Sequence, residues 1–478
     1  MGCLYNRLRE YSRSDYYGFH MPGHKRQLNM LGSEPAYAID ITEIEGFDDL
    51  HHAEGLLKSA QERAAKVYYG EETHFLINGS SVGILSAVAG VTKRGDTVLV
   101  ARNCHKSVYH AIEMNGLNPV YLAPGFHASM QMNTEVFAED VKAALRANPK
   151  IRAVVIVSPT YEGVISDVEA IVGAAHEKGI PVIVDEAHGA HFGFHPYFPE
   201  NSNKKGADIV IHSLHKTLPS LTQTALLHIN GNLVRREKVR RFIHMLQSSS
   251  PSYILMASMD SCIEMLENRR QELFEPYVRS LQALREELQA LKGLKLVWTD
   301  RYDPSKLVIS GEDVGLTGKM LYRILLEKYH LQMEMAAGKY VLAMTTVGDT
   351  QEGFRRLSCA LSEIDEENRR RGRESFQKTG NIPCLPAPDV VYNSSEIEEM
   401  LEHFHETGVN RVKARLWRDS VGYVSVEYAY LYPPGIPLIV PGERVSQEAA
   451  DMLQWYYEMG FSIEGLKRDS YIEVLAHG

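Results

Sequence analysis

Cysteine and long apolar runs are scarce in this chain, and it lacks an excess of positive charge. The cysteines show no CxxC spacing and are odd in number: Cys3, Cys104, Cys262, Cys359 and Cys384. This pattern excludes a disulfide framework or a zinc knuckle and leads us to expect a reducing, cytoplasmic location. No stretch approaches the roughly 18 apolar residues of a membrane span, and the first residues lack the apolar core of a signal peptide. Acidic residues outnumber basic ones, 61 to 51, so we expect neither nucleic acid nor a membrane as a partner.

The composition is that of a folded chain with several domains. Hydrophobic residues make up 44% and charged residues 23%, which are ordinary values for globular proteins. Prolines at 383, 386 and 388 predict a linker. We therefore expect an N-terminal arm over residues 1–60, a large domain over 61–292, a small α/β domain over 293–382 and a C-terminal domain over 383–478. The arm is polar and punctuated by Gly and Pro, so we expect it to pack on another domain or subunit.

Short apolar segments alternate with helical periodicity through the middle of the chain. Several carry Val and Ile at consecutive positions, which is typical of strands buried on both faces. We expect strands at 73–77, 97–101, 119–122, 153–157, 181–184, 209–212 and 225–228, and helices between them at 82–91, 107–114, 138–147 and 168–177. This alternation predicts an α/β fold with a mainly parallel, seven-stranded sheet and crossover helices. Near the end, a Tyr-rich strand is expected at 423–430, between helices at 396–405 and 446–457.

Polar residues with distinctive chemistry follow two of the expected strands. Lys216 stands in Ser-Leu-His-Lys after the strand at 209–212. An amine near apolar surroundings stays neutral and can form a Schiff base, although a surface lysine after an edge strand would look the same. Asp185 ends the preceding strand, so both side chains are expected at the same carboxyl edge of the sheet, where α/β sheets bind ligands. An aspartate there could pair with the protonated ring nitrogen of pyridoxal.

Two further strand ends carry polar clusters. Ser80 and Ser81 open a helix after the first strand, where free N–H groups could bind phosphate; a simple helix cap is the alternative. His105 follows the strand at 97–101 and could stack on a flat ring, whereas a helix start capped by Asn103 or Ser107 is the plainer interpretation. The histidines at 188, 191 and 195 suggest a metal, but their spacing matches no zinc signature, so we expect no metal.

Taken together, these clusters resemble the ornithine/lysine/arginine decarboxylase family, which consists of pyridoxal 5'-phosphate enzymes of the aspartate aminotransferase fold type I. The resemblance extends over nearly the whole chain, and its length is similar to that of the shorter, Gram-positive-type members. The matching segments are Pro-Gly-His-Lys at 22–25, the acidic segment at 40–51, Asn-Cys-His-Lys-Ser at 103–107, Ser-Leu-His-Lys at 213–216, Pro-Pro-Gly-Ile-Pro at 433–437 and Pro-Gly-Glu at 441–443.

The resemblance implies a role for each matching residue. Lys216 would hold the cofactor covalently, Asp185 would pair with its ring nitrogen, and His105 and Ala187 would pack on the two ring faces. His188 would lie near Lys216 or the ring oxygen. The phosphate would be held by Ser80, Ser81 and Ser213, with His215 close by. Ser249 and Ser250 would reach the phosphate of a neighbouring subunit, which implies a homodimer or higher homo-oligomer.

The implied reaction is decarboxylation of a basic L-amino acid. We expect arginine to give agmatine and CO2, with lysine or ornithine as alternative substrates; an aminotransferase or a catalytically silent regulator of the same fold are the less favoured interpretations. A proton would return to the substrate from Lys216 or His215. The substrate's cationic end would need an acidic partner, and the candidates are Glu45, Asp48, Asp49, Glu427 and Glu443.

Overall fold

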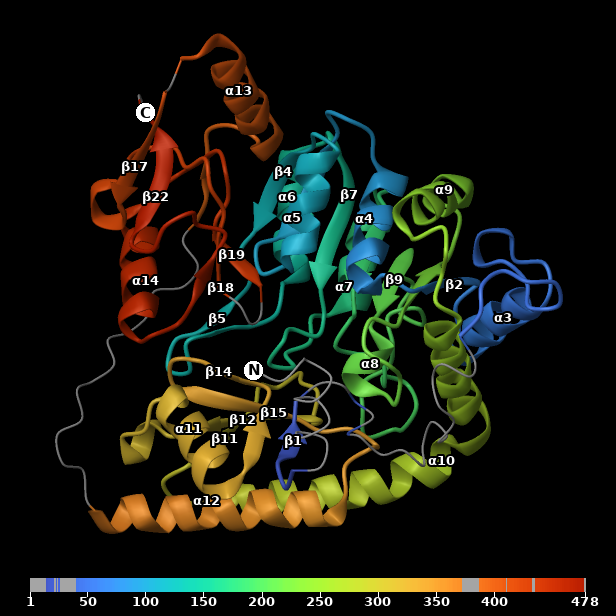
Figure 1. Cartoon of the computed structure of the whole chain (residues 1–478), viewed down its shortest axis with the longest axis vertical. Coiled ribbons are helices and arrows are strands. Elements are labelled where there is room, and N and C mark those ends of the chain that lie inside the picture. The colour runs from blue at the N-terminus through green and yellow to red at the C-terminus, as the bar shows by residue number, and fades with distance from the viewer. Residues whose placement is uncertain are drawn as a thin grey trace.

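The architecture comes from a computed structural model that describes residues 14–20, 23, 25, 40–371, 387–409, 411–431 and 435–476. It contains a large sheet domain, a smaller sheet that lies below it in Figure 1, and a C-terminal unit at the upper left. Within the described part of the chain, no helix is both long and apolar enough to cross a membrane.

The large domain is built on a seven-stranded sheet with the order β2-β10-β9-β8-β7-β3-β4. Five neighbouring strands of this sheet pair in parallel, whereas β10 runs antiparallel to both β2 and β9. This confirms the predicted mainly parallel, seven-stranded sheet. The strands are β2 (Glu72–Leu76), β3 (Thr97–Ala101), β4 (Asn118–Leu122), β7 (Ile151–Val157), β8 (Val182–Asp185), β9 (Ile209–His212) and β10 (Ala225–Ile229).

Helices cover both faces of this sheet, as buried parallel strands require (Figure 1). The helices of this domain are α3 (Leu56–Tyr68), α4 (Gly79–Val91), α5 (Lys106–Met114), α6 (Ala138–Ala147), α7 (Val168–His176), α8 (Leu214–Thr217) and α9 (Arg236–Leu246). Helix α4 approaches its neighbours closely because it carries glycines. A Cβ on Gly83 would lie 2.6 Å from Leu76, and one on Gly90 would lie 2.5 Å from Val239. Helix α4 therefore packs tightly against β2 and α9.

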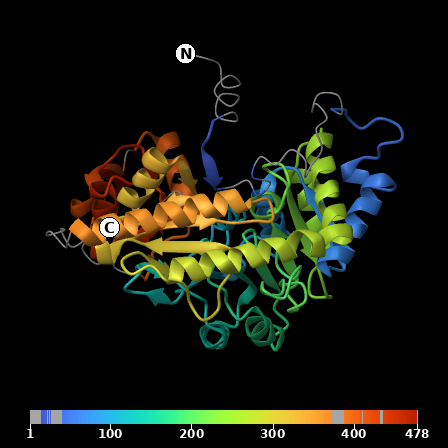
Figure 2. The ribbon, with the colours of Figure 1, turned by 90° about the horizontal axis from the view of Figure 1, so that it is seen from below.

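The long helix α10 (Tyr253–Gln289) connects the large domain to a four-stranded sheet with the order β11-β12-β15-β14. The remaining elements of this small domain are β11 (Lys295–Val297), β12 (Lys306–Ser310), α11 (Gly318–Tyr329), β13 (Leu331–Met333), β14 (Met335–Ala336), β15 (Tyr340–Met344) and α12 (Gln351–Arg371). Helices α10 and α12 lie side by side (Figure 2). Part of the expected N-terminal arm forms β1 (Tyr17–Phe19), which pairs in parallel with β13.

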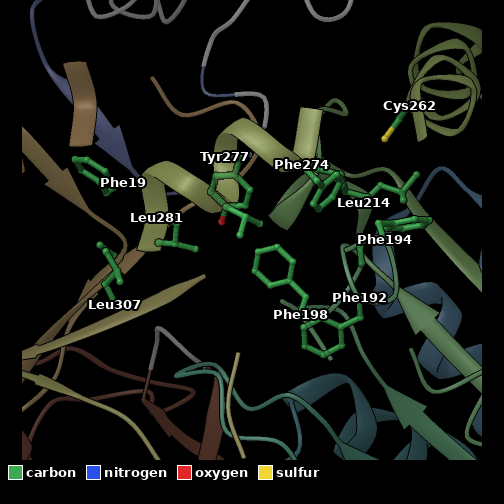
Figure 3. Close-up of a cluster of buried hydrophobic side chains, with 14 of the residues drawn as sticks. Phe19, Phe192, Phe194, Phe198, Leu214, Cys262, Phe274, Tyr277, Leu281 and Leu307 are labelled. Carbon is green, nitrogen blue, oxygen red and sulfur yellow. The ribbon is translucent and has the colours of Figure 1, made fainter. Parts of the chain in front are cut away.

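One apolar core joins the large and small domains. Phe198 of the large domain stacks on Tyr277 of α10, with ring centroids 5.8 Å apart. Leu307 of β12 belongs to the same buried cluster (Figure 3). Because such cores are packed as tightly as organic crystals, β12 is held rigidly relative to the large sheet.

The C-terminal unit differs from the prediction in one respect. The expected strand at 423–430 is wrong: only its end belongs to β18 (Ala429–Leu431). The backbone before it makes only isolated bridges, Val424 to Arg444 and Ser425 to Val474, which belong to two other strands of this unit. The other elements are β16 (Asp389–Val390), α13 (Ser394–Thr407), β17 (Val412–Leu416), β19 (Ile436–Ile439), β20 (Glu443–Arg444), α14 (Gln447–Glu458), β21 (Ile463–Glu464) and β22 (Tyr471–Leu475).

Candidate active site

A cavity of about 370 Å³ opens at the carboxyl edge of the large sheet. Its size suits a cofactor with a small substrate. Most of its lining comes from segments that follow β2, β3, β7, β8 and β9, so parallel strands bring distant parts of the sequence to one place. The lining residues are Gly79, Ser80, Ser81, Asn103, His105, Asn133, Val157, Thr160, Tyr161, Glu162, Asp185, Ala187, His188, His215, Lys216, Thr222 and Ile436.

Lys216 lies in the short helix α8, directly after β9, and its side chain lines the cavity. Its Nζ is 3.0 Å from Nε2 of His188. Burial lowers the pKa of Lys216, while the carboxylates of Asp185 and Glu334 oppose that shift. Burial also lowers the pKa of His188 well below its usual value, and the two lysines beside it act in the same direction. Burial therefore shifts the amine toward its neutral, nucleophilic form, beside a neutral imidazole.

Asp185 is the last residue of β8, and its side chain is 4% exposed. The backbone N–H of Ala187 donates to Oδ1 at 3.1 Å. Burial raises the pKa of Asp185, although Lys216 pulls it down. A positively charged partner in the cavity would stabilise the ionised form of this buried carboxylate.

His105 is the N-cap residue of α5, so the cap falls on neither Asn103 nor Ser107. Its Nδ1 accepts from the backbone N–H of Ser107 at 3.2 Å and lies 2.8 Å from that residue's Oγ. Burial, followed by the charges of Lys216 and Lys106, lowers the pKa of His105 to about 3. The ring is thus held neutral and in a fixed orientation in the cavity wall.

The serines expected to hold phosphate fall into two groups. Ser80 and Ser81 line the cavity from the first turn of α4, after Gly79 at φ +76°. The residues that line the cavity do not include Ser213, Ser249 or Ser250. Ser213 is fully buried, and its Oγ has no hydrogen-bond partner among the described residues.

Ser249 and Ser250 belong to an exposed loop between α9 and α10. The N–H of Ser248 donates to Oδ1 of Asn78 at 3.1 Å. Asn78 is the N-cap residue of α4. The loop is therefore anchored next to the helix start that carries Ser80 and Ser81.

The histidines considered as metal ligands have separate partners. Nε2 of His191 is 3.1 Å from Oδ1 of Asp303, and Nε2 of His195 is 3.3 Å from Oε2 of Glu275. His188 lies at the cavity instead. Among the described residues, no group of three or more His, Cys, Asp or Glu side chains is arranged to hold a metal ion.

Sequence reasoning missed the cavity residues that follow β7. Thr160, Tyr161 and Glu162 all line the cavity. The side chain of Glu162 is buried, and Tyr340 donates to its Oε1 at 2.9 Å. Burial raises the pKa of Glu162. The signal was present, since polar residues directly follow an expected apolar strand, as they do at Asp185 and Lys216.

Four of the five expected partners of a substrate cation are engaged elsewhere. Asp48 accepts from backbone N–H groups that include those of Gly55 and Leu57, each at 2.9 Å. Asp49 caps the turn at His51. These carboxylates hold the backbone, because unsatisfied N–H groups at helix starts need acceptors.

The other two form structural contacts in the C-terminal unit. Glu427 accepts from the backbone N–H groups of Lys467 and Glu473. Glu443 forms a buried ion pair with Arg102, 3.0 Å between Oε2 and Nη2. Glu45 is exposed and is also absent from the described lining of the cavity. The residues at 22, 24 and 432–434 that carried part of the resemblance lie outside the described residues.

The cavity suits pyridoxal phosphate, the cofactor that the fold implies. Asn103 lines it, and its Oδ1 is a buried polar atom with no hydrogen-bond partner among the described residues. Asp185 and Lys216 supply a buried carboxylate and an amine at the same wall, and Ser80 with Ser81 supplies hydroxyls at a helix N-terminus, which favours phosphate. Polar atoms left unpaired inside a protein call for such a partner.

Comparison with known proteins agrees with this geometry. Residues 2–301 match the model of the Orn/Lys/Arg decarboxylase major domain, and residues 393–465 match the model of the Orn/Lys/Arg decarboxylase C-terminal domain. The chain is 35% identical to the uncharacterized protein YaaO of Bacillus subtilis, over 97% of this chain and 95% of that one. It is 31% identical to an arginine decarboxylase of Bacillus subtilis, with the same coverage of each.

The fold has solved counterparts as well. The lysine decarboxylase LdcF of Francisella novicida superposes with a TM-score of 0.79 at 20% identity, over 98% of this chain and 80% of that one. This likeness shows the fold, which is that of fold type I enzymes, and the family models extend over most of the sequence. The chain belongs to the Orn/Lys/Arg decarboxylase family.

Proposed function

We propose that this chain is a pyridoxal phosphate-dependent decarboxylase that converts L-arginine to agmatine and CO2. One observation carries the proposal: the amine of Lys216 and the buried carboxylate of Glu162 belong to the lining of the same cavity. A reactive amine and a carboxylate in one cavity suit an amino acid with a positively charged end. Relatives about 31% identical over nearly their whole length are named arginine decarboxylases, which favours arginine over lysine or ornithine.

The residues around the cavity have distinct roles in this proposal. Bound pyridoxal phosphate supplies a ring that withdraws the electron pair released as CO2 leaves. Lys216 would hold the cofactor, and Asp185 would keep the proton on its ring nitrogen. The neutral ring of His105 and Ala187, which both line the cavity, would pack on the ring. Ser80 and Ser81, at the N-terminus of α4, would receive the phosphate, assisted by His215, which also lines the cavity.

Glu162 recognises the substrate's guanidinium. Burial disfavours its ionised form, so a cation that enters the cavity restores the favourable charge balance. The hydrogen bond from Tyr340 orients one oxygen. A carboxylate can bind a guanidinium through two parallel hydrogen bonds, whereas an ammonium offers only a point charge.

Lys216 is the better source of the proton that returns to the substrate. Nδ1 of His215 lies 3.0 Å from the carbonyl oxygen of Thr224. A carbonyl only accepts, so Nδ1 carries the proton, and a neutral ring then has a lone pair at Nε2. Such a ring cannot donate from Nε2 without first becoming charged. Lys216 can carry that proton as an ammonium, a form that the carboxylates of Asp185 and Glu334 favour.

We also propose a homodimer and a cytoplasmic location. The exposed loop with Ser249 and Ser250 is anchored beside the start of α4 and lies outside the described cavity lining. That placement supports a role for these serines in the site of a neighbouring subunit. The buried cysteines Cys104 and Cys262 are free thiols, which is in keeping with a reducing compartment.

Reconstitution with pyridoxal phosphate tests the proposal. We expect visible absorbance from a covalent linkage and, after borohydride reduction, cofactor on the single peptide that contains Lys216. CO2 release should be fastest with arginine, compared with lysine, ornithine and the uncharged norleucine. A colourless protein, or cofactor trapped on a different lysine, would overturn the cofactor assignment. Equal rates with norleucine and arginine would overturn recognition of the cation, and amino transfer without CO2 release would favour an aminotransferase.

A further inference from the structure

A second buried lysine contacts the active-site histidine. Lys306 is the first residue of β12, in the small domain, and its side chain has no exposed surface. Its Nζ lies 3.3 Å from Nδ1 of His188. The other ring nitrogen of His188 lies 3.0 Å from Nζ of Lys216. One imidazole therefore bridges two amines, one from each domain.

The backbone is shaped to let Lys306 reach this position. Gly163 has φ +104°, and a Cβ built on it would lie 2.7 Å from Cγ of Lys306. The N–H of Asp303 donates to the carbonyl of Gly163 at 2.8 Å. A glycine is needed here for its conformation and for the close approach. The aliphatic part of the Lys306 side chain therefore packs on the backbone of Gly163 as it extends toward His188.

Charged groups surround Lys306 on several elements. Its ammonium interacts electrostatically with the carboxylates of Asp303, Glu162 and Glu334 and with the cations of Lys216 and Lys25. Burial lowers the pKa of Lys306 to about 8, and Asp303 opposes that shift.

Asp303 is itself held by bonds to His191 at 3.1 Å and to the N–H of Ser305 at 2.9 Å. Although burial acts to raise the pKa of Asp303, His191 and Lys306 lower it. Asp185, Glu334, His105 and His215 also act on Lys216 or His188, and the ring of Tyr161 lies 4.5 Å from that of His188. Lys306 can therefore exchange a proton near neutral pH beside an ionised carboxylate.

Hydrogen-bond chemistry couples the two amines. A neutral imidazole donates from one nitrogen and accepts at the other. When the ammonium of Lys306 donates to Nδ1, the N–H at Nε2 must donate to a neutral Lys216. When an ammonium at Lys216 donates to Nε2, the N–H at Nδ1 must donate to a neutral Lys306. With a neutral His188, the bridge therefore allows only one of the two amines to be an ammonium at a time.

We propose that Lys306 is a positioning residue that sets the protonation of Lys216 through His188. Its ammonium keeps Lys216 neutral when that amine must act as a nucleophile. To protonate Lys216, Lys306 gives a proton to Nδ1 and His188 gives its Nε2 proton to Lys216. One proton is lost by Lys306 and one is gained by Lys216, while His188 changes tautomer and stays neutral. The inference rests on the proposed function only in taking Lys216 as the reactive amine.

The cofactor-free protein allows a test that does not depend on activity. Trace acetic anhydride is added between pH 6 and 10, and acetylation of Lys216 is followed by peptide mass spectrometry; the midpoint reports the pKa of Lys216. Lys306→Met should raise that midpoint by about one unit and reduce acetylation at pH 7 about tenfold. Lys306→Arg, which keeps a charged donor, should leave the midpoint within a few tenths of a unit.

Controls separate the bridge from loosened packing. Lys339→Met removes another buried lysine of the small domain, which pairs with Glu312 at 2.7 Å, and should leave the midpoint unchanged. In a His188→Phe background, Lys306→Met should shift the midpoint by less than a third as much, because the ring no longer carries protons. An equal shift in both backgrounds, or no shift in Lys306→Met, would overturn the proposal.

A further variant covers a failure to fold. If Lys306→Met does not fold, Lys306→Gln keeps an amide donor for Nδ1 without the charge. It should raise the midpoint in the same direction, and an unchanged midpoint would overturn the proposal equally. Failure of the decarboxylase assignment would instead appear as missing CO2 release with the amine coupling intact, so the two outcomes are distinguishable.

Discussion

Replacing Glu162 by Gln should separate substrate recognition from stability. The substitution keeps the size of the side chain and its bond to Tyr340 but removes a negative charge from the cavity wall. Removing one partner of a desolvated, charged pair weakens binding by about 2–5 kcal/mol. At about 1.4 kcal/mol per factor of ten, kcat/KM for arginine should fall by between about thirtyfold and several thousandfold. The value for norleucine should change little, because norleucine has no terminal charge.

Glu443 provides the matched control. It is also buried, yet its carboxylate pairs with Arg102, whose side chain is 2% exposed, and accepts from the N–H of Val440 at 3.0 Å. Removing one partner of a buried ion pair costs about 3–5 kcal/mol of stability. Glu443→Gln should therefore lower the midpoint of urea unfolding and leave the ratio of kcat/KM for arginine over norleucine unchanged.

The acid side of the pH profile gives a second signature of Glu162. Because burial raises the pKa of Glu162 above its usual value, the side chain becomes protonated at a higher pH than an exposed glutamate. The ionised form binds arginine, so kcat/KM for arginine should fall as the pH is lowered through this raised value. That limb should vanish in Glu162→Gln. Recognition by Glu162 is refuted if Glu162→Gln keeps both arginine selectivity and the acid limb, or if Glu443→Gln loses selectivity without losing stability.

Two further predictions concern the frame of the site and its assembly. Gly163→Ala should destabilise the fold by about 1–3 kcal/mol, because φ +104° is strained for alanine and the new methyl would meet Lys306. Calorimetry should show a lower Tm for this variant. Gly173→Ala should leave the Tm unchanged, because its Cβ would meet nothing within 4 Å. Mixed dimers of Lys216→Ala subunits with Ser249→Ala, Ser250→Ala subunits should recover part of the activity, since one hybrid site would be intact, and the absence of recovery would contradict shared sites.

Much of the site could be predicted because parallel sheets obey a simple geometric rule. Residues that follow buried strands meet at the carboxyl edge, so apolar runs followed by Lys216, Asp185 or His105 placed those side chains correctly in one cavity. The same rule would have found Glu162, which follows β7. The Tyr-rich strand expected at 423–430 was wrong because Val424 and Ser425 make only isolated bridges, to β20 and β22, and that pairing depends on contacts from distant segments.

The sequence by itself determined the sheet, the helices that cover it and the edge where chemistry takes place, because strand burial and helical periodicity are local properties of the chain. Only the tertiary structure decided what each carboxylate does. Asp48, Asp49, Glu427 and Glu443 are all acidic in the sequence, yet each is held by backbone N–H groups or by Arg102. Lys306 shows the same limit of prediction from sequence. Its contact with His188 forms between two domains that share one core. No local sequence pattern predicts a contact between residues so far apart in the chain.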